Sequence, residues 1–142
     1  MLLTAPLAAA ATTPPPDAPA ADRLISGSTE FGVALYKEMA KTPGNIVVSP
    51  LSVLIATAML DGAAEGETRT EIATGARFGV PETALHDELR ELLDELATRV
   101  NHWAELSFAN GLWVDRSCSM ARSYQALLER SYDAMADTLA GC

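Results

Sequence analysis

The sequence contains little cysteine, and this excludes one class of small protein. Among 142 residues there are two cysteines, Cys118 and Cys142. A small domain held together by disulfides carries four or more, so the chain is not of that class. We expect a free thiol at the terminal Cys142, with a Cys118–Cys142 pair as the alternative. Two cysteines do not indicate a cellular compartment.

Positive charge is also scarce. The chain has ten Lys and Arg residues and 19 Asp and Glu residues, which gives a formal net charge of −9. Because phosphate backbones and anionic lipid surfaces repel an acidic protein, we expect no nucleic-acid partner and no membrane partner. No apolar stretch reaches the roughly 18 to 20 residues that a membrane-spanning helix needs.

The motifs of common catalytic and metal sites are missing. Ser49 and Ser52 have no nucleophile elbow around them, and neither has a partner base in the sequence pattern. His86 and His102 stand in different settings, which indicates structural or exposed roles rather than a metal pair or a general base.

Acidic residues do not supply a calcium site either. Asp61, Glu65 and Glu67 are close in sequence, but glycines separate them without the spacing of a calcium loop. There is no CxxC motif and no glycine-rich phosphate loop. We therefore expect no enzymatic activity, no cofactor and no metal.

The residues that are present predict a leader followed by one domain. Residues 1–27 are rich in Ala, Pro and Thr and predict a disordered leader or linker, whereas residues 28–142 predict a folded domain. Apolar residues near the start resemble a secretory signal, but no Lys or Arg precedes them and Pro6 interrupts them. A secreted protein and a cytoplasmic one with a plain linker both stay open.

Local patterns predict the elements of the first half. Ser28 begins an amphipathic helix that ends before residues 43–44, and residues 46–48 form a short buried strand. Ser49 and Pro50 then start a helix over residues 51–60 that is apolar nearly all round, which predicts burial on every side.

The second half predicts three further helices and a longer strand. A capping-box pattern at Thr68 starts one helix, and Pro81 opens another with leucines at helical spacing and a solvated acidic face. Residues 106–114 alternate in polarity and predict a strand with Asn110 in its middle. A last helix spans residues 124–132, so the fold class is α+β and mostly helical, with about five helices.

The order of these motifs resembles the serpin family, whose members are serine protease inhibitors. The resemblance extends over roughly residues 29–136, and its most specific stretch is residues 45–52, Asn-Ile-Val-Val-Ser-Pro-Leu-Ser. Residues 58–68 and 109–114 are similar to the family's Gly-Ala, Gly, Thr run and to a strand of its main sheet. Ser28 and Glu71 depart mildly from the family pattern, which often has Asn and Gln there.

The resemblance implies only the amino-terminal portion of the serpin fold. Serpins are well over twice as long, so we expect a fragment that lacks the hinge and the reactive-centre loop and is not inhibitory by itself. For a full-length relative, the family implies a serine or cysteine protease as partner. The alternative is a non-inhibitory binding module on the same scaffold. The acidic leucine helix argues against heparin binding.

The resemblance also implies roles for particular residues. In the family, the segment that resembles residues 45–52 lies beneath the main sheet where its strands part, and small hydroxyls there can re-form hydrogen bonds as the gap opens. The residues that it assigns to this sheet-opening region are Asn45, Ser49, Pro50, Ser52 and Asn110. Simple helix capping is the alternative for the serines. Gly62, Gly66 and Thr68 are turn and cap residues under either interpretation.

Overall fold

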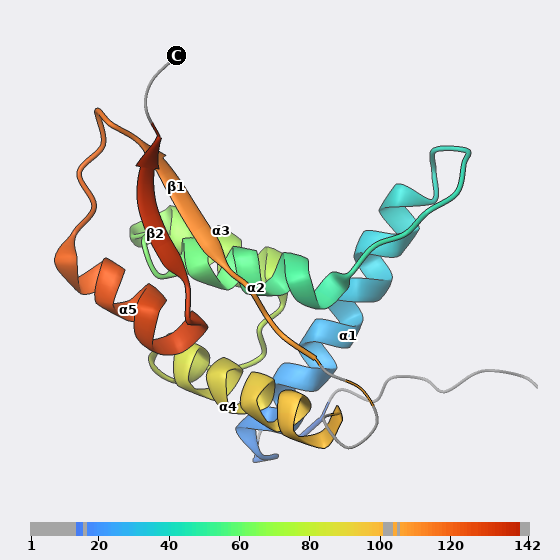
Figure 1. Cartoon of the computed structure of the whole chain (residues 1–142). Helices are drawn as coiled ribbons and strands as arrows, with labels where there is room; N and C mark the ends of the chain where they lie inside the picture. Colours follow the sequence, from blue (N-terminus) through green and yellow to red (C-terminus); the bar gives the residue numbers. More distant parts are fainter. Residues whose placement is uncertain (1–13, 16, 101–103, 105, 140–142) are drawn as a thin grey trace, which may run out of the picture.

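The computed structural model describes residues 14–15, 17–100, 104 and 106–139, apart from the side chain of Val100. Most of the expected leader, as well as His102 and Cys142, lies outside these residues. The described chain forms five helices and one two-stranded sheet (Figure 1).

The first helix, α1 (Ala20–Met39), begins earlier than the sequence predicts. Ser28 does not cap it but lies inside it, and its hydroxyl donates to the carbonyl of Ile25 at 2.9 Å. Residues 20–27, which were expected to belong to the leader, are therefore helical. Alanine is the best helix former, and Leu24 is fully buried, so both local propensity and packing extend the helix toward Pro19.

Three further helices pack around a common core. They are α2 (Pro50–Asp61), α3 (Gly66–Ala76) and α4 (Glu82–Val100). The leucine spacing predicted for α4 is confirmed, since its apolar face is buried. The fully buried leucines of the core are Leu24, Leu54, Leu85, Leu89 and Leu128.

Helix α2 is where the sequence predicts it, but it is buried on one side only. Leu54, Ile55 and Met59 are buried, whereas Leu60 is 54% exposed. Burial on every side requires protein all round the helix, and the described residues supply it on one side only. Helices α1, α3 and α4 contact α2, and none of them covers the face that carries Leu60.

The predicted short strand at residues 46–48 is not formed. These residues are extended, but no described strand pairs with them, and Val47 is 96% exposed. The last turns of α1 and the loop that follows project from the rest of the molecule (Figure 1). A β-branched run favours extended backbone, but a strand also needs a hydrogen-bonding partner.

The capping box predicted at Thr68 is wrong, because helix α3 (Gly66–Ala76) begins earlier in the chain. It begins at Gly66, whose φ of +59° is the left-handed conformation that glycine adopts without strain. Thr68 lies inside the helix rather than at its cap, and the Thr70 hydroxyl donates to the carbonyl of Gly66 at 3.2 Å. Since the chain can turn at Gly66, the helix starts before the Ser/Thr pattern is reached.

The carboxyl-terminal part forms a strand–helix–strand unit. Strand β1 (Gly111–Asp115), helix α5 (Arg122–Tyr132) and strand β2 (Met135–Leu139) follow one another, and the two strands pair in parallel with Gly111 opposite Met135. The predicted strand over residues 106–114 is therefore shorter, and Asn110 precedes it instead of lying in its middle. The sequence patterns did not predict β2, whose residues Asp137 and Thr138 are polar.

Candidate functional site

A groove runs between α2 and the segment that leads into β1. Its volume is about 820 Å³, and its floor and walls are mostly apolar. The residues that line it are Ser52, Ile55, Ala56, Met59, Leu60, Ser107, Phe108, Ala109, Asn110, Gly111, Leu112, Trp113 and Met135. Two of the residues that the sequence singled out, Ser52 and Asn110, therefore come together in one groove from different elements.

Ser49 and Ser52 form a hydroxyl pair at the start of α2. Ser49 is the N-cap, and its Oγ accepts a hydrogen bond from the main-chain N–H of Ser52 at 3.3 Å. The two hydroxyl oxygens lie 2.8 Å apart. The predicted Ser-Pro helix start is thus confirmed. Both side chains are exposed, so their remaining donor and acceptor positions can take another partner.

Pro50 fits closely against α1. A Cβ added to Gly32 would lie 2.9 Å from the Cβ of Pro50, so the two helices approach each other at a position where only glycine fits. Pro50 lines a second hollow on the α1 side of α2 and not the groove of Ser52. Asn45 is exposed in the loop before α2 and lines neither hollow.

Asn110 connects the end of α5 with the start of β2. Its side-chain Nδ2 donates to the carbonyl of Tyr132 at 2.9 Å, and its own carbonyl accepts from the main-chain N–H of Met135 at 3.2 Å. Asp133, between these two partners, has a left-handed φ of 46° that ends α5. Asn110 therefore holds the turn from which the parallel strand β2 departs.

Trp113 forms an exposed wall of the groove. Its side chain is 52% exposed, and its ring lies over Gly111, where an added Cβ would be 2.5 Å from the ring. Leu60 and Met135 on the same groove are also more than half exposed, at 54% and 63%. An apolar surface of this kind is typical of a face that another protein segment covers.

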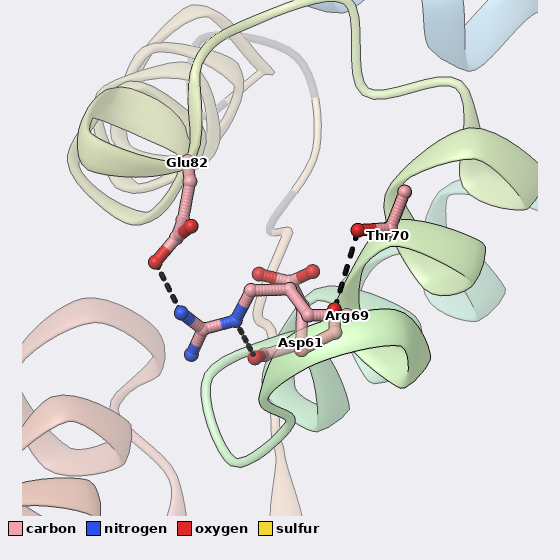
Figure 2. Close-up of polar contacts among 5 residues, drawn as sticks. Asp61, Arg69, Thr70 and Glu82 are labelled. Carbon is pink, nitrogen blue, oxygen red and sulfur yellow. Dashed lines mark hydrogen bonds and ion pairs between the residues drawn. The ribbon is translucent and has the colours of Figure 1, made fainter.

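A polar cluster lies away from this groove, where α2, α3 and α4 meet (Figure 2). Arg69 donates from Nε to the main-chain carbonyl of Asp61 at 3.2 Å and forms an ion pair with Glu82. Burial raises the pKa of the Asp61 carboxyl, and the nearby Arg69 opposes this rise. Gly62 provides the C-cap of α2 as predicted, and Gly66 provides the turn into α3.

His86 and Tyr132 form a second, partly buried contact in the same region. His86 Nδ1 and the Tyr132 hydroxyl lie 2.6 Å apart, and the rings meet edge to face. Burial lowers the pKa of His86 and raises the pKa of Tyr132. The sequence left a structural and an exposed role open for His86, and its contact with Tyr132 is a structural one.

Sequence patterns did not identify the Asp61 cluster. One sequence signal could have indicated it. Asp61 is the last residue of the apolar helix α2, and a carboxylate at the carboxyl end of a helix interacts unfavourably with the helix dipole.

Within the described residues, no group of three or more His, Cys, Asp or Glu could hold a metal ion. No helix in that part of the chain is long and apolar enough to cross a membrane.

Solved structures define the fold class of the chain. Arabidopsis AtSerpin1 in its native stressed conformation matches with a TM-score of 0.73 and 24% identity, over 86% of this chain and 32% of that one. Cleaved Serpin 42Da matches with a TM-score of 0.72 and 22% identity, over 85% of this chain and 32% of that one. At these identities the likeness shows the fold, which is the mostly helical part of an α+β serpin.

The sequence comparisons then show the family. The family model for serpins, the serine protease inhibitors, matches residues 26–140, so the chain belongs to the serpin family. Serpin A3-6 of Bos taurus is 38% identical over 102 residues, which is 68% of this chain and 24% of that protein. Corticosteroid-binding globulin of Oryctolagus cuniculus is 32% identical over 121 residues, 80% of this chain and 30% of that protein. The chain thus spans less than a third of these relatives.

Proposed function

We propose that these 142 residues form the amino-terminal scaffold of a serpin and do not trap a protease by themselves. The observation that carries the proposal is the groove of Ser52 and Asn110, because β1 and the first residue of β2 line it and the apolar side chains of Trp113 and Met135 there are exposed. A scaffold of this kind supports the sheet that a protease-cleaved loop enters in the family. The chain contains no catalytic constellation in its sequence and is proposed to be a non-enzyme.

In this proposal Ser49, Ser52 and Asn110 serve the opening of the sheet. The hydroxyl pair is exposed at the start of α2, and Asn110 bonds to the end of α5 and to the first residue of β2. Short hydroxyl side chains can exchange hydrogen-bond partners with little loss of side-chain entropy when neighbouring strands move apart. Asn45 and Pro50 would shape the approach of the chain to this region.

Incubation with serine and cysteine proteases tests the proposal. We expect the chain to be degraded or ignored by each protease, with no complex that survives SDS. A covalent, SDS-stable complex formed by the 142-residue chain would contradict the proposed absence of inhibition. As a positive control, a full-length inhibitory serpin should form such a complex with the same protease preparation.

A non-inhibitory binding module is the second candidate function. It is favoured by an apolar hollow of about 620 Å³ between α1 and α2, with walls that include Gly32, Val33, Tyr36 and Leu51. One relative is named a corticosteroid-binding globulin, which makes a corticosteroid the first ligand to test. Saturable binding of cortisol to the purified chain would support this candidate, and a linear, non-saturable signal would exclude a corticosteroid as its ligand.

Two expectations about partners and location are part of the proposal. The exposed face of α4 carries Asp87, Glu91, Asp94 and Glu95, so we propose that it does not bind heparin. Retention on a heparin column at physiological salt would contradict this.

We propose a secreted protein, with the cytoplasm as the alternative. Amino-terminal sequencing of the secreted product would show whether the leader is removed.

A further inference from the structure

A pocket lies between α3, the start of α4 and the end of α2. Its volume is about 570 Å³, which is in the range of small-molecule sites. One part of its wall is polar, with Asp61, Arg69, Thr70, Thr74 and Glu82, and the rest is formed mainly by Ala73, Phe78, Val80 and Leu85. None of the residues that line the Ser52 groove lines this pocket.

The carboxylate of Asp61 is the unusual group in this pocket. The residue is 1% exposed, and its Oδ1 has no hydrogen-bond partner among the residues that the structure describes. A buried carboxylate oxygen without a donor costs free energy, so such an atom in a pocket wall indicates a missing partner.

The neighbouring cation does not supply that partner. Arg69 directs its Nε to the main-chain carbonyl of Asp61 and pairs with Glu82 through its terminal nitrogen (Figure 2). Thr70 and Thr74 donate their hydroxyl hydrogens to main-chain carbonyls of their own helix. Of the donors around the pocket whose bonds the structure records, each is thus directed to an acceptor other than Asp61 Oδ1.

The charges of the pocket select the ligand class. Asp61 and Glu82 carry two carboxylates against the one guanidinium of Arg69, and burial lowers the pKa of His86 nearby, which keeps that ring neutral at pH 7. The formal net charge of −9 for the whole chain also attracts cations. An ammonium group provides up to three donors for Asp61, and an attached apolar group would contact Ala73 and Val80.

We propose that the pocket between α2, α3 and α4 binds a small organic monocation, with its ammonium group on Asp61 and its apolar body against Ala73, Phe78 and Val80. The contact is a charge-assisted hydrogen bond to a buried carboxylate, and burial strengthens such a bond relative to one in solution. The site is separate from the sheet-opening region and does not depend on protease inhibition.

Titration of the full chain with phenethylammonium, followed by two-dimensional amide NMR, tests the proposal. We expect saturable shifts of main-chain amides around the pocket, such as those of Thr70, Thr74 and Val80. The neutral isostere 2-phenylethanol should bind about tenfold more weakly or worse, because it cannot form the charged contact. Equal affinity for the two compounds, or shifts spread over the acidic surface without saturation, would overturn the proposal.

Variants locate the contact. Asp61→Asn should weaken phenethylammonium binding by about tenfold or more, whereas Asp87→Asn, an exposed carboxylate on α4, should leave the affinity unchanged. Ala73→Leu should abolish phenethylammonium binding, since the larger side chain fills the apolar part of the pocket and leaves Asp61 in place. If Asp61→Asn does not fold, Ala73→Leu decides, and an unchanged affinity in that variant would overturn the proposal.

Discussion

At the scale of single residues, Asn110 shows how one side chain determines a connection. It donates to the last carbonyl of α5 and accepts from the first amide of β2, so one residue joins three consecutive elements. Sequence patterns identified Asn110 as a residue of interest but placed it inside a strand. Its actual partners, Tyr132 and Met135, lie on the far side of α5 along the chain, and local patterns do not report such contacts.

Replacing Asn110 should measure this connection. Asn110→Ala removes the donor to Tyr132 and leaves a partly buried carbonyl unpaired, so we expect the free energy of unfolding to fall by about 1–3 kcal/mol. Urea unfolding followed by far-UV circular dichroism gives the value. The matched control is Asn45→Ala at an exposed position, for which we expect a change within about 0.5 kcal/mol. Equal effects of the two substitutions would contradict the assigned role.

His86 should make stability depend on pH. Burial lowers its pKa below the ordinary value of 6.5, so the folded state binds fewer protons than the unfolded state in this range. The stability that the neutral ring contributes is therefore present above pH 6.5 and is lost as the pH falls from 6.5 toward the folded-state pKa. We expect the difference in unfolding free energy between the native chain and His86→Gln to decrease over this range in urea titrations. A difference that is constant from pH 7.5 to pH 5 would contradict this.

At the scale of elements, α2 shows why local patterns describe a helix better than its environment. The Ser-Pro start and the Gly62 cap were predicted because both depend on neighbouring residues. The side of α2 that is buried was not predicted, since all of its faces are apolar. Burial follows from the neighbours α1, α3 and α4, which pack on one side.

Two leucines on α2 test this one-sided burial. Leu54→Ala should lower the free energy of unfolding by about 2–5 kcal/mol, because it leaves a cavity at a fully buried position. Leu60→Ala, on the same helix but 54% exposed, should cost less than about 1 kcal/mol. The two urea unfolding curves should differ clearly, and similar values would mean that Leu60 is covered in solution.

At the scale of the whole molecule, exposed apolar side chains form a surface of the kind that another protein segment usually covers. Leu60, Trp113 and Met135 are each more than half exposed along one groove, and Val47 is almost fully exposed in an unpaired extended segment. The two-stranded sheet also has unpaired edges within the described residues. Such edges and patches favour association between chains.

We therefore expect the isolated chain to self-associate. Light scattering at increasing concentration should show species larger than a monomer, and Trp113→Lys should reduce them because it replaces an apolar side chain with a charged one at the groove. Thr98→Lys on the exposed surface of α4 adds the same charge without removing apolar area and should change little. A chain that stays monomeric over the whole concentration range would contradict the expectation.

The sequence by itself determined the five helices, most of their ends and the family, because caps, prolines and apolar spacing act over a few residues. It also identified Ser52 and Asn110 without showing that they share a groove. Only the tertiary structure decided which extended segments become strands, since residues 46–48 have no partner while β2 pairs with β1. Tertiary packing likewise created the Asp61 pocket, because strand pairing and burial depend on residues far apart in the chain.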